Sequence, residues 1–361
     1  MKKRQAISFI LLLLGLSALL SFPAAALVSA SSAILYEPTT GLVLYEKDAD
    51  RRRPMASTTK IVTALAATEA LSPDTEITVP KEAVGVEGTS TYLEEGEVLT
   101  LENLLYALLL QSANDAAVAI AIAADGSIEA FADRMNDIAL RLGLQNTHFT
   151  NPHGLPDEAH YTTARELAIL TAEALKNPLI RQIVATERKA FSSSLRRRVL
   201  TNHNKLLRLY DNAIGVKTGF TKAAGRCLVG AAEVDGLTLI SVTLHASDDW
   251  NDHMALFDRG FSEYERTTVV CGGEIVWRLS VINGTFPFVE IQNGDAYSRI
   301  EKKGDASYSV AVDIAAMPVA PIREGDVLGY LRIYRNGKEV ARLPLSAAYP
   351  VDKASIKKKR F

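Results

Sequence analysis

The sequence predicts an α/β or α+β sandwich with a helical subdomain, followed by a small all-β domain. Strand-like segments near both ends of residues 31–265 flank a helical middle, so we expect one sheet built from both ends of that region. Residues 266–350 read instead as short strands separated by turn residues, with little helical periodicity. The 361 residues, 48% hydrophobic and 23% charged, are enough for two buried cores.

Residues 1–30 have the layout of a secretory signal peptide. Basic residues at positions 2–4 precede an apolar run over 7–20, and small residues follow. We expect cleavage near Ala26 or Ala30, and an uncleaved membrane anchor is the alternative. No other stretch has enough apolar residues to cross a bilayer, so we expect an exported protein that is secreted or peripheral to the outer face of the cell membrane.

Charge and cysteine content narrow the function classes. The formal net charge is −2, and it becomes −5 once the three basic residues of the signal segment are removed. Nucleic-acid-binding domains carry clustered Lys and Arg, so we expect no nucleic acid as a partner. Cys227 and Cys271 lack the paired spacing of a zinc site, and they either form one disulfide or remain two buried thiols.

The catalytic region begins with a hairpin that leads into a helix. Strands are expected at residues 33–36 and 42–46. Apolar residues then recur at helical spacing over 58–71, with Ser57 at the N-cap or in the first turn. The hydroxyl of Ser57 and the ammonium of Lys60 are therefore expected on one face of this helix.

The middle of the chain is predicted to be helical, and strands return after it. Helical periodicity extends over residues 101–175, with loops at Asp125-Gly126 and at Asn151-Pro152-His153-Gly154. Three strands are then expected, at 214–218, 227–234 and 237–244. Asp235-Gly236 between the last two is a strong hairpin signal.

The second domain is predicted over residues 266–350 and a basic tail over 351–361. Its expected strands cover residues 269–281, 308–314, 327–335 and 338–344. Asn336-Gly337 joins the last two strands by a turn that is typical of small antiparallel sheets.

Three short motifs carry the chemistry. They are Ser57-Thr58-Thr59-Lys60, Ser112-Ala113-Asn114 and Lys217-Thr218-Gly219. Alone, the first is usually a helix cap with a solvated charge, the second a polar break and the third an ordinary strand end. Here the first opens an apolar helix, the second interrupts a helical region and the third lies on a strand before a hairpin. This order and these contexts set the three motifs apart from their ordinary occurrences.

Ser57 and Lys60 fit nucleophilic catalysis because a serine hydroxyl is a poor nucleophile until a base takes its proton. A lysine three positions further along a helix projects from the same face. Lys60 must then be neutral part of the time, which requires burial or a neighbouring positive charge. Lys217 is a candidate for that charge.

The motifs together resemble those of the low-molecular-mass penicillin-binding proteins, the D-alanyl-D-alanine carboxypeptidases with the serine β-lactamase fold. The resemblance covers roughly residues 30–350, including the small β-domain. Further segments that look like this family are Tyr92-Leu93-Glu94-Glu95-Gly96, Leu110-Gln111-Ser112-Ala113-Asn114-Asp115-Ala116, Asn151-Pro152-His153-Gly154-Leu155, Thr162-Thr163-Ala164-Arg165-Glu166 and Gly215-Val216-Lys217-Thr218-Gly219-Phe220-Thr221.

The resemblance implies catalytic roles for the first two motifs. Ser57 would be the acylated nucleophile and Lys60 its base. Ser112 would relay a proton between the lysines and the leaving amine. Asn114 would bind the peptide carbonyl of the substrate or hold Lys60.

The third motif would then bind the substrate. Lys217 and Thr218, followed by Gly219, would receive its terminal carboxylate. The backbone N–H groups of Ser57 and Phe220 would form the oxyanion hole.

The same resemblance implies the partners. The substrate would be a peptidoglycan stem peptide ending in D-Ala-D-Ala, and β-lactam antibiotics would be covalent inhibitors. The protein would act in peptidoglycan biosynthesis and cell shape. We expect no cofactor and no metal, because no His-Glu-x-x-His pattern occurs.

Three alternatives remain. A β-lactamase would need a deacylating glutamate between the second and third motifs, and Glu166 falls there, although we interpret it as a first-turn capping acid. A DD-endopeptidase on wall cross-links needs the same residues. A non-catalytic binder of wall peptides would not need the nucleophile.

The basic tail departs from the family pattern. Many related carboxypeptidases end in an amphipathic membrane helix, but residues 351–361 hold only three bulky apolar residues. They do carry five basic residues, which would favour weak contact with an anionic membrane.

Overall fold

The computed structural model describes residues 28–314 and 316–355, and these form two compact units. The first runs to Glu233 and resumes over Thr238–Arg259; the second comprises Val234–Leu237 and the chain from Gly260 onward. Within the described residues, no helix is both long and apolar enough to cross a membrane. Both cysteines are free thiols, so the expected disulfide is wrong; Cys227 is buried, as the other alternative expected, but Cys271 is exposed.

A five-stranded sheet of order β2-β1-β9-β8-β7 forms one layer of the first unit. Its strands are β1 (Ser32–Glu37), β2 (Leu42–Lys47), β7 (Ala213–Thr221), β8 (Gly225–Val234) and β9 (Leu237–Ala246). The first two and the last three come from opposite ends of the unit, as predicted. Asp235 and Gly236 both have positive φ, of 50° and 75°, as a tight hairpin turn requires. Because β7 is an edge strand, one side of it is free to face the site.

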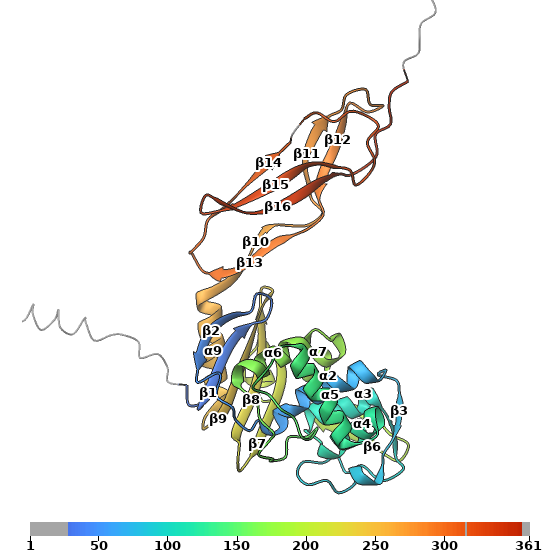
Figure 1. The fold of residues 1–361 in the computed structure, drawn as a ribbon, viewed down its shortest axis with the longest axis vertical. Coiled ribbons are helices and arrows are strands. Elements are labelled where there is room, and N and C mark those ends of the chain that lie inside the picture. Colours follow the sequence, from blue (N-terminus) through green and yellow to red (C-terminus); the bar gives the residue numbers. More distant parts are fainter. Residues whose placement is uncertain (1–27, 315, 356–361) are drawn as a thin grey trace, which may run out of the picture. The chain divides into compact units, whose positions relative to one another are not determined.

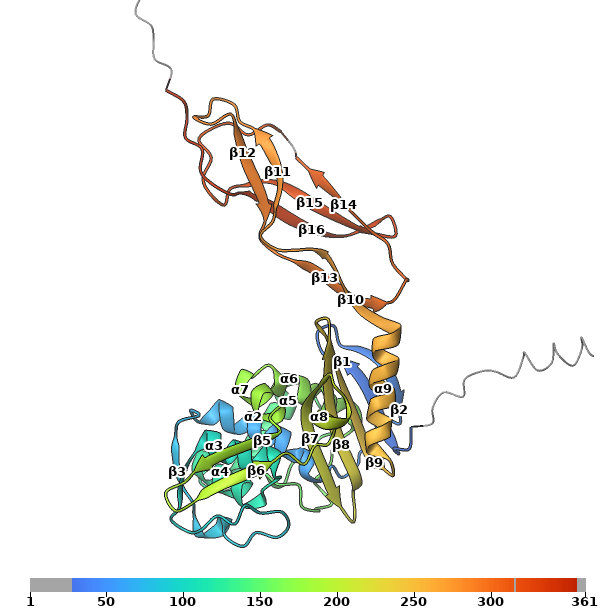
Figure 2. The same ribbon diagram turned by 180° about the vertical axis from the view of Figure 1, so that it is seen from behind.

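Helices cover both faces of this sheet (Figures 1 and 2). They are α2 (Lys60–Ala70), α3 (Leu101–Leu110), α4 (Asn114–Asp125), α5 (Ile128–Arg141), α6 (Ala164–Leu175), α7 (Pro178–Val184), α8 (Leu206–Leu209) and α9 (Asp249–Glu263). Helix α6 contacts β1, while α2 and α7 contact β7. On the other face, His253 of α9 lies against Ser241 and Thr243 of β9. Burial on both faces explains the almost continuous apolar runs of β8 and β9.

Helix α4 is at the centre of the helical layer. Its residues Asn114–Ala121 are all buried, and it contacts α2, α3 and α5. Small alanines at six of its twelve positions let these neighbours approach closely. The helix ends at Asp125, where Gly126 takes the left-handed conformation, as the Asp125-Gly126 signal predicted.

The helical start at Ser57 differs from the prediction. Residues Ala56–Thr59 form a 3₁₀ turn, and α2 begins only at Lys60. Thr59 occupies the N-cap position of α2, and no side chain caps it. The Ser57 hydroxyl is therefore not used as a helix cap.

Several elements were not predicted. Strand β3 (Glu76–Thr78) pairs antiparallel with β4 (Val98–Thr100) across a long connection, and β5 (Arg188–Ser192) forms a hairpin with β6 (Arg197–Thr201). Helix α9 was missed because polar residues face inward: Asp252 and His253 are buried beside Leu256 and Phe257, and this interrupts the apolar periodicity.

The second unit consists mainly of antiparallel β-strands in two sheets. Two antiparallel strands, β10 (Tyr264–Val270) and β13 (Tyr297–Lys302), form one small sheet. The larger sheet has the order β11-β12-β16-β15-β14, made of β11 (Ile275–Ser280), β12 (Phe288–Asn293), β14 (Tyr308–Asp313), β15 (Val327–Arg335) and β16 (Lys338–Ala347). Val289, Ile291, Leu331 and Leu345 are central to its core.

Sequence periodicity placed β14, β15 and β16 in this unit correctly but not the strand over residues 269–281. That expected strand is broken into β10 and β11, because the chain turns at Gly272 and Gly273, where φ of Gly273 is 78°. The Asn336-Gly337 turn is confirmed, with φ of 50° and 78°.

Candidate active site

Ser57 lies in a tight turn that neighbouring backbone holds from two sides. Ala56 has a positive φ of 48°. A Cβ at Gly154 would lie 2.0 Å from the Ala56 carbonyl oxygen, so the loop after α5 packs directly under the turn. A Cβ at Gly219 would lie 3.1 Å from the Ser57 nitrogen, so strand β7 packs against it from the other side. Only glycine permits the approach at position 154, and a side chain at position 219 would require the turn to shift by a few tenths of an ångström.

The Lys60 amine lies beside the Ser57 hydroxyl. Lys60 Nζ is 3.0 Å from Ser57 Oγ, 2.7 Å from Asn114 Oδ1 and 2.6 Å from the His153 carbonyl oxygen. The Lys60 side chain is fully buried. A neutral amine here donates its two N–H groups to Asn114 and His153, and its lone pair then faces the hydroxyl of Ser57. The His153 contact was not predicted.

Burial favours the neutral form of the Lys60 amine. It holds the pKa of Lys60 well below its ordinary value of 10.5, the charge of Lys217 lowers that pKa further, and Asp115 opposes both effects. Burial also lowers the pKa of Lys217, to about 7. The charge of Lys217 acts on Lys60 as expected in direction, but burial of Lys217 itself makes that charge less persistent than that of a solvated lysine. Lys217 Nζ donates to the Thr218 carbonyl oxygen at 2.9 Å.

The second motif lies between α3 and α4. Ser112 is 6% exposed and has a positive φ of 61°, which is uncommon for a residue other than glycine. Asn114 begins α4, where its amide contacts Lys60 through the oxygen and the Glu87 carbonyl oxygen through Nδ2 at 2.5 Å. Of the two roles expected for Asn114, the contact with Lys60 is present.

A cavity of about 440 Å³ opens between the two layers at these residues. The expected site residues Ser57, Ser112, Thr218, Gly219 and Phe220 line it. Its wall also includes residues that the motifs did not indicate, namely Thr89, His203, Arg226, Cys227, Asp249 and Trp250.

Among these unpredicted residues, Arg226 and Asp249 form an ion pair with an N–O distance of 2.5 Å. Arg226 is opposite Phe220 in the β7–β8 register, which the sequence analysis did not predict. His203 lies beside the end of α3, since its backbone N–H donates to the Leu110 carbonyl oxygen at 3.0 Å.

Glu166 has a structural position. Its N–H donates to the hydroxyl of Thr163, the N-cap of α6. Its carboxylate does not return to the cap, as a capping box would require, but accepts from the Gln145 and Asn146 N–H groups and from the Thr147 hydroxyl. The capping interpretation was therefore right for the backbone of Glu166 and wrong for its side chain.

The histidines near the site contact hydroxyl and backbone groups. Burial lowers the pKa of His153 to about 3, helped by the charge of Lys60, and lowers that of His160 to about 4. His160 Nε2 is 2.8 Å from the Thr59 hydroxyl. Across the described residues, no group of three or more His, Cys, Asp and Glu side chains has an arrangement that could hold a metal ion.

Comparison with known proteins identifies the family on both parts of the chain. Residues 21–248 match the D-alanyl-D-alanine carboxypeptidase family, and residues 264–353 match the C-terminal domain of penicillin-binding protein 5. The chain is 34% identical over 338 residues to D-alanyl-D-alanine carboxypeptidase DacF of Bacillus subtilis, covering 91% of this chain and 87% of that protein. It is 32% identical over 335 residues to DacC of Escherichia coli, covering 88% and 83%.

A solved structure shows the same architecture. Penicillin-binding protein 5 from Haemophilus influenzae superposes with a TM-score of 0.67 at 26% identity, covering 90% of this chain and 98% of that one. These likenesses confirm the predicted fold class, a serine β-lactamase-type sandwich with a C-terminal β-domain. The chain therefore belongs to the D-alanyl-D-alanine carboxypeptidase family of serine peptidases, the low-molecular-mass penicillin-binding proteins.

Proposed function

We propose that this carboxypeptidase removes the terminal D-alanine from peptidoglycan stem peptides, with Ser57 as nucleophile and Lys60 as base. The observation that carries this assignment is the 3.0 Å separation between Ser57 Oγ, which lines the cavity, and Nζ of the fully buried Lys60. A buried amine with a lowered pKa takes the hydroxyl proton far more readily than a solvated ammonium.

In the proposed reaction, Ser57 Oγ attacks the carbonyl carbon between the two D-alanines as its proton moves to Lys60. The N–H groups of Ser57 and Phe220 stabilise the oxyanion. Collapse breaks the peptide bond, and the leaving amine takes a proton that Ser112 relays from Lys60. Water then hydrolyses the ester and frees Ser57. Asn114 keeps the Lys60 amine in place.

The terminal carboxylate binds at strand β7. Lys217 supplies the positive charge and Thr218 a hydroxyl donor, and Gly219 lets strand β7 pack closely against the turn that holds Ser57. This division of roles is supported by the position of Thr218 and Gly219 in the cavity wall and of Lys217 in the buried layer behind it.

β-Lactams would acylate the same serine and remain bound. The carboxylate of Glu166, which a β-lactamase would need beside the ester, is instead occupied by the loop at residues 145–147. We therefore propose slow deacylation and a covalent penicillin complex. Removal of D-alanine from wall peptides would limit cross-linking and so influence cell shape.

We also propose that the chain is exported by cleavage of an N-terminal signal peptide. Residues 1–27 lie outside the described residues, but Ser29 and Ala30 donate three hydrogen bonds to the Asp252 carboxylate on α9, at 2.7 to 3.0 Å. Cleavage near Ala26 keeps these contacts in the mature protein, whereas cleavage after Ala30 removes them. This favours Ala26, and the catalytic domain would then begin a few residues before position 31.

The β-domain of residues 266–350 and the tail of residues 351–361 would follow the catalytic domain. Most of the tail, residues 356–361, lies outside the described residues. Its basic side chains support a loose contact with an anionic membrane that salt screens, because stable anchoring takes a second, hydrophobic signal.

The direct test is product analysis with a synthetic peptide ending in D-Ala-D-Ala and with a cross-linked wall dimer. We expect release of free D-alanine from the first to exceed cleavage of the second, and neither product from Ser57→Ala. Preferential cleavage of the cross-link would replace the proposed carboxypeptidase with an endopeptidase.

A further inference from the structure

One wall of the cavity is a loop with little regular structure that buried charges hold in place. We call residues 84–97, between the 3₁₀ turn Lys81–Ala83 and β4, the rim loop. Thr89 of this loop lines the catalytic cavity. Tyr92, three residues further along the loop, has a positive φ of 56° and is 77% exposed. A bulky residue keeps such a conformation only where its surroundings fix the backbone.

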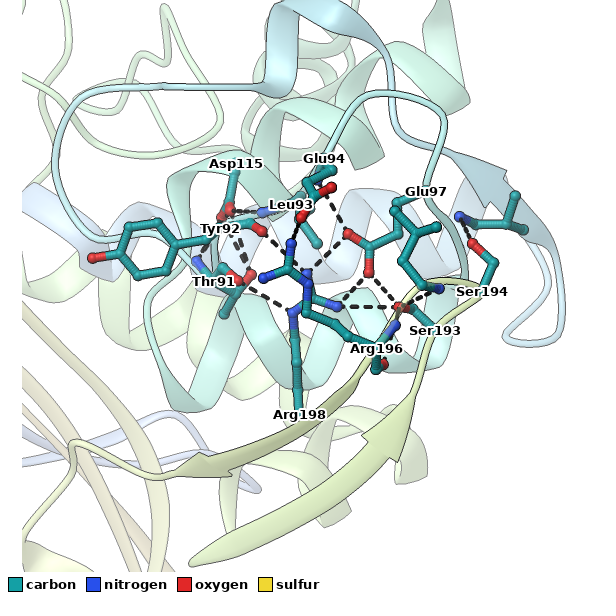
Figure 3. Close-up of polar contacts among 12 residues, drawn as sticks. Thr91, Tyr92, Leu93, Glu94, Glu97, Asp115, Ser193, Ser194, Arg196 and Arg198 are labelled. Atoms are coloured by element: carbon teal, nitrogen blue, oxygen red, sulfur yellow. Dashed lines mark hydrogen bonds and ion pairs between the residues drawn. The ribbon is translucent and has the colours of Figure 1, made fainter.

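The first fixing group is Asp115, the second residue of α4, which is 1% exposed. Its carboxylate accepts from the Thr91 and Leu93 N–H groups, each at 3.0 Å, and from the Ser90 hydroxyl at 2.6 Å. These bonds hold the loop on both sides of Tyr92, and Figure 3 shows the Tyr92 ring pointing away from the charged cluster.

The second fixing group is the buried ion pair of Arg198, on β6, with Glu97. Glu97 is fully buried and Arg198 is 7% exposed. The guanidinium binds both carboxylate oxygens of Glu97, and it also donates to the carbonyl oxygens of Thr91 and Tyr92, each at 3.2 Å. Figure 3 shows Arg198 reaching from its strand into the loop. A planar fork with several fixed donors is needed to make all these contacts at once.

The other end of the rim loop orients Asn114. The Asn114 N–H donates to the Thr89 carbonyl oxygen at 2.7 Å, and its Nδ2 donates to the Glu87 carbonyl oxygen at 2.5 Å. A Cβ at Gly88 would lie 2.7 Å from that same Nδ2, so the loop backbone is closely packed on the amide. Because the loop takes the NH₂ end of the amide, the oxygen end faces Lys60.

We propose that Arg198 and Glu97 are positioning residues for the carboxypeptidase reaction, acting through the rim loop and Asn114 on the amine of Lys60. This proposal rests on the proposed function, since it assumes that Lys60 is the base for Ser57. It also gives the buried pair a role beyond stability, because buried ion pairs contribute little net stability compared with apolar residues of the same size.

The test is the rate at which penicillin acylates Ser57 in Arg198→Lys, measured across pH. Lysine keeps the charge beside Glu97 but not the fork that also holds Thr91 and Tyr92. We expect acylation on the order of 10- to 100-fold slower than in the parent, because small displacements of reacting groups are costly. We also expect the ascending limb of the pH profile to move to lower pH. The Asn114 side-chain oxygen, which stabilises the charged amine of Lys60, would turn away from it, and the pKa of Lys60 would fall.

The matched control is Arg196→Lys. Arg196 lies two residues away on the same hairpin and pairs with Glu94 of the same loop, but both side chains of this pair are exposed, at 41% and 56%. We expect the parent rate and pH profile for this variant. If Arg198→Lys does not fold, as judged by circular dichroism, Glu97→Gln keeps the shape of the pair and carries the same test, with a smaller rate loss.

The outcomes separate this proposal from the proposed function. One label per chain at completion in every variant, absent from Ser57→Ala, keeps the proposed function standing. A parent rate with a parent pH profile in a folded Arg198→Lys would overturn the positioning role. An equal loss in Arg196→Lys would overturn it too, because general electrostatics of the loop would then explain both effects.

Discussion

The substitution Glu166→Gln tests whether Glu166 has a structural role or takes part in deacylation. The Glu166 side chain is buried, and its two oxygens accept from two backbone N–H groups and one hydroxyl in the loop of residues 145–147. Glutamine keeps the size of the side chain. Its NH₂ group, however, cannot accept the hydrogen bonds that one of the two carboxylate oxygens accepted from this loop. The variant should therefore lose stability and keep its deacylation chemistry.

The decrease in the free energy of unfolding can be estimated from these hydrogen bonds. Hydrogen bonds to a charged group contribute about 1.5–3 kcal/mol each, and those to a neutral group about 1 kcal/mol. One amide oxygen still serves the two N–H groups, while the Thr147 hydroxyl loses its bond to the carboxylate and keeps its contact with the Thr162 hydroxyl. We therefore expect the free energy of unfolding to fall by about 2–4 kcal/mol.

Two assays check this expectation. Urea unfolding gives the stability difference, and recovery of free enzyme from the penicillin complex gives the deacylation rate, which we expect to change less than about twofold because no step in the account uses Glu166. Glu173→Gln on the same helix is the control, because its ion pair with Lys176 is partly exposed and should contribute about 0.5 kcal/mol or less. Deacylation slowed tenfold or more with unchanged stability would refute the reasoning and favour a β-lactamase-like role for Glu166.

Three further predictions concern the lysines, a buried histidine and the tail. Lys60→Ala should lower acylation by about 10²- to 10⁴-fold with little change in substrate binding, whereas Lys217→Ala should mainly raise KM; equal losses in both constants for both variants would contradict this division. Burial lowers the pKa of His253 to about 3, below its ordinary value of 6.5, so the unfolded chain binds the proton first and stability is lost as pH falls from 6.5 toward 3. His253→Gln should reduce the slope of unfolding free energy against pH there by about 1.4 kcal/mol per pH unit, and an unchanged slope would show that His253 is not held neutral. The mature protein should leave anionic vesicles at high salt, and deletion of residues 356–361, which keeps the fully buried Val351 of the β-domain core, should strongly weaken binding at low salt; retention at molar salt would reveal another anchor.

The parts of the fold that local pattern controls were predictable. Asp235-Gly236 and Asn336-Gly337 adopt the positive φ values that their composition favours. Helix α9 and the break at Gly272-Gly273 were not predictable by the same means. In α9 the inward-facing His253 bonds to hydroxyls of β9, a partner that periodicity does not reveal.

The site divides in the same way. Ser57 and Lys60 are three residues apart, so their proximity follows from local helical geometry, although the turn at Ser57 is 3₁₀ and the helix starts at Lys60. The His153 carbonyl that accepts from Lys60 comes from 93 residues away. Arg198 likewise reaches the rim loop from more than 100 residues away. Long-range contacts of this kind depend on the assembled layers and have no local sequence motif.

The nucleophile is the central claim, and intact-mass analysis after incubation with penicillin tests it most directly. We expect the parent protein to gain the mass of one penicillin molecule, with the label on the peptide that contains Ser57 and persisting after the free drug is removed. Ser57→Ala should gain no mass under the same conditions, while its circular dichroism matches that of the parent. A mass increase that persists in Ser57→Ala, or a label on another residue of the parent, would contradict the account.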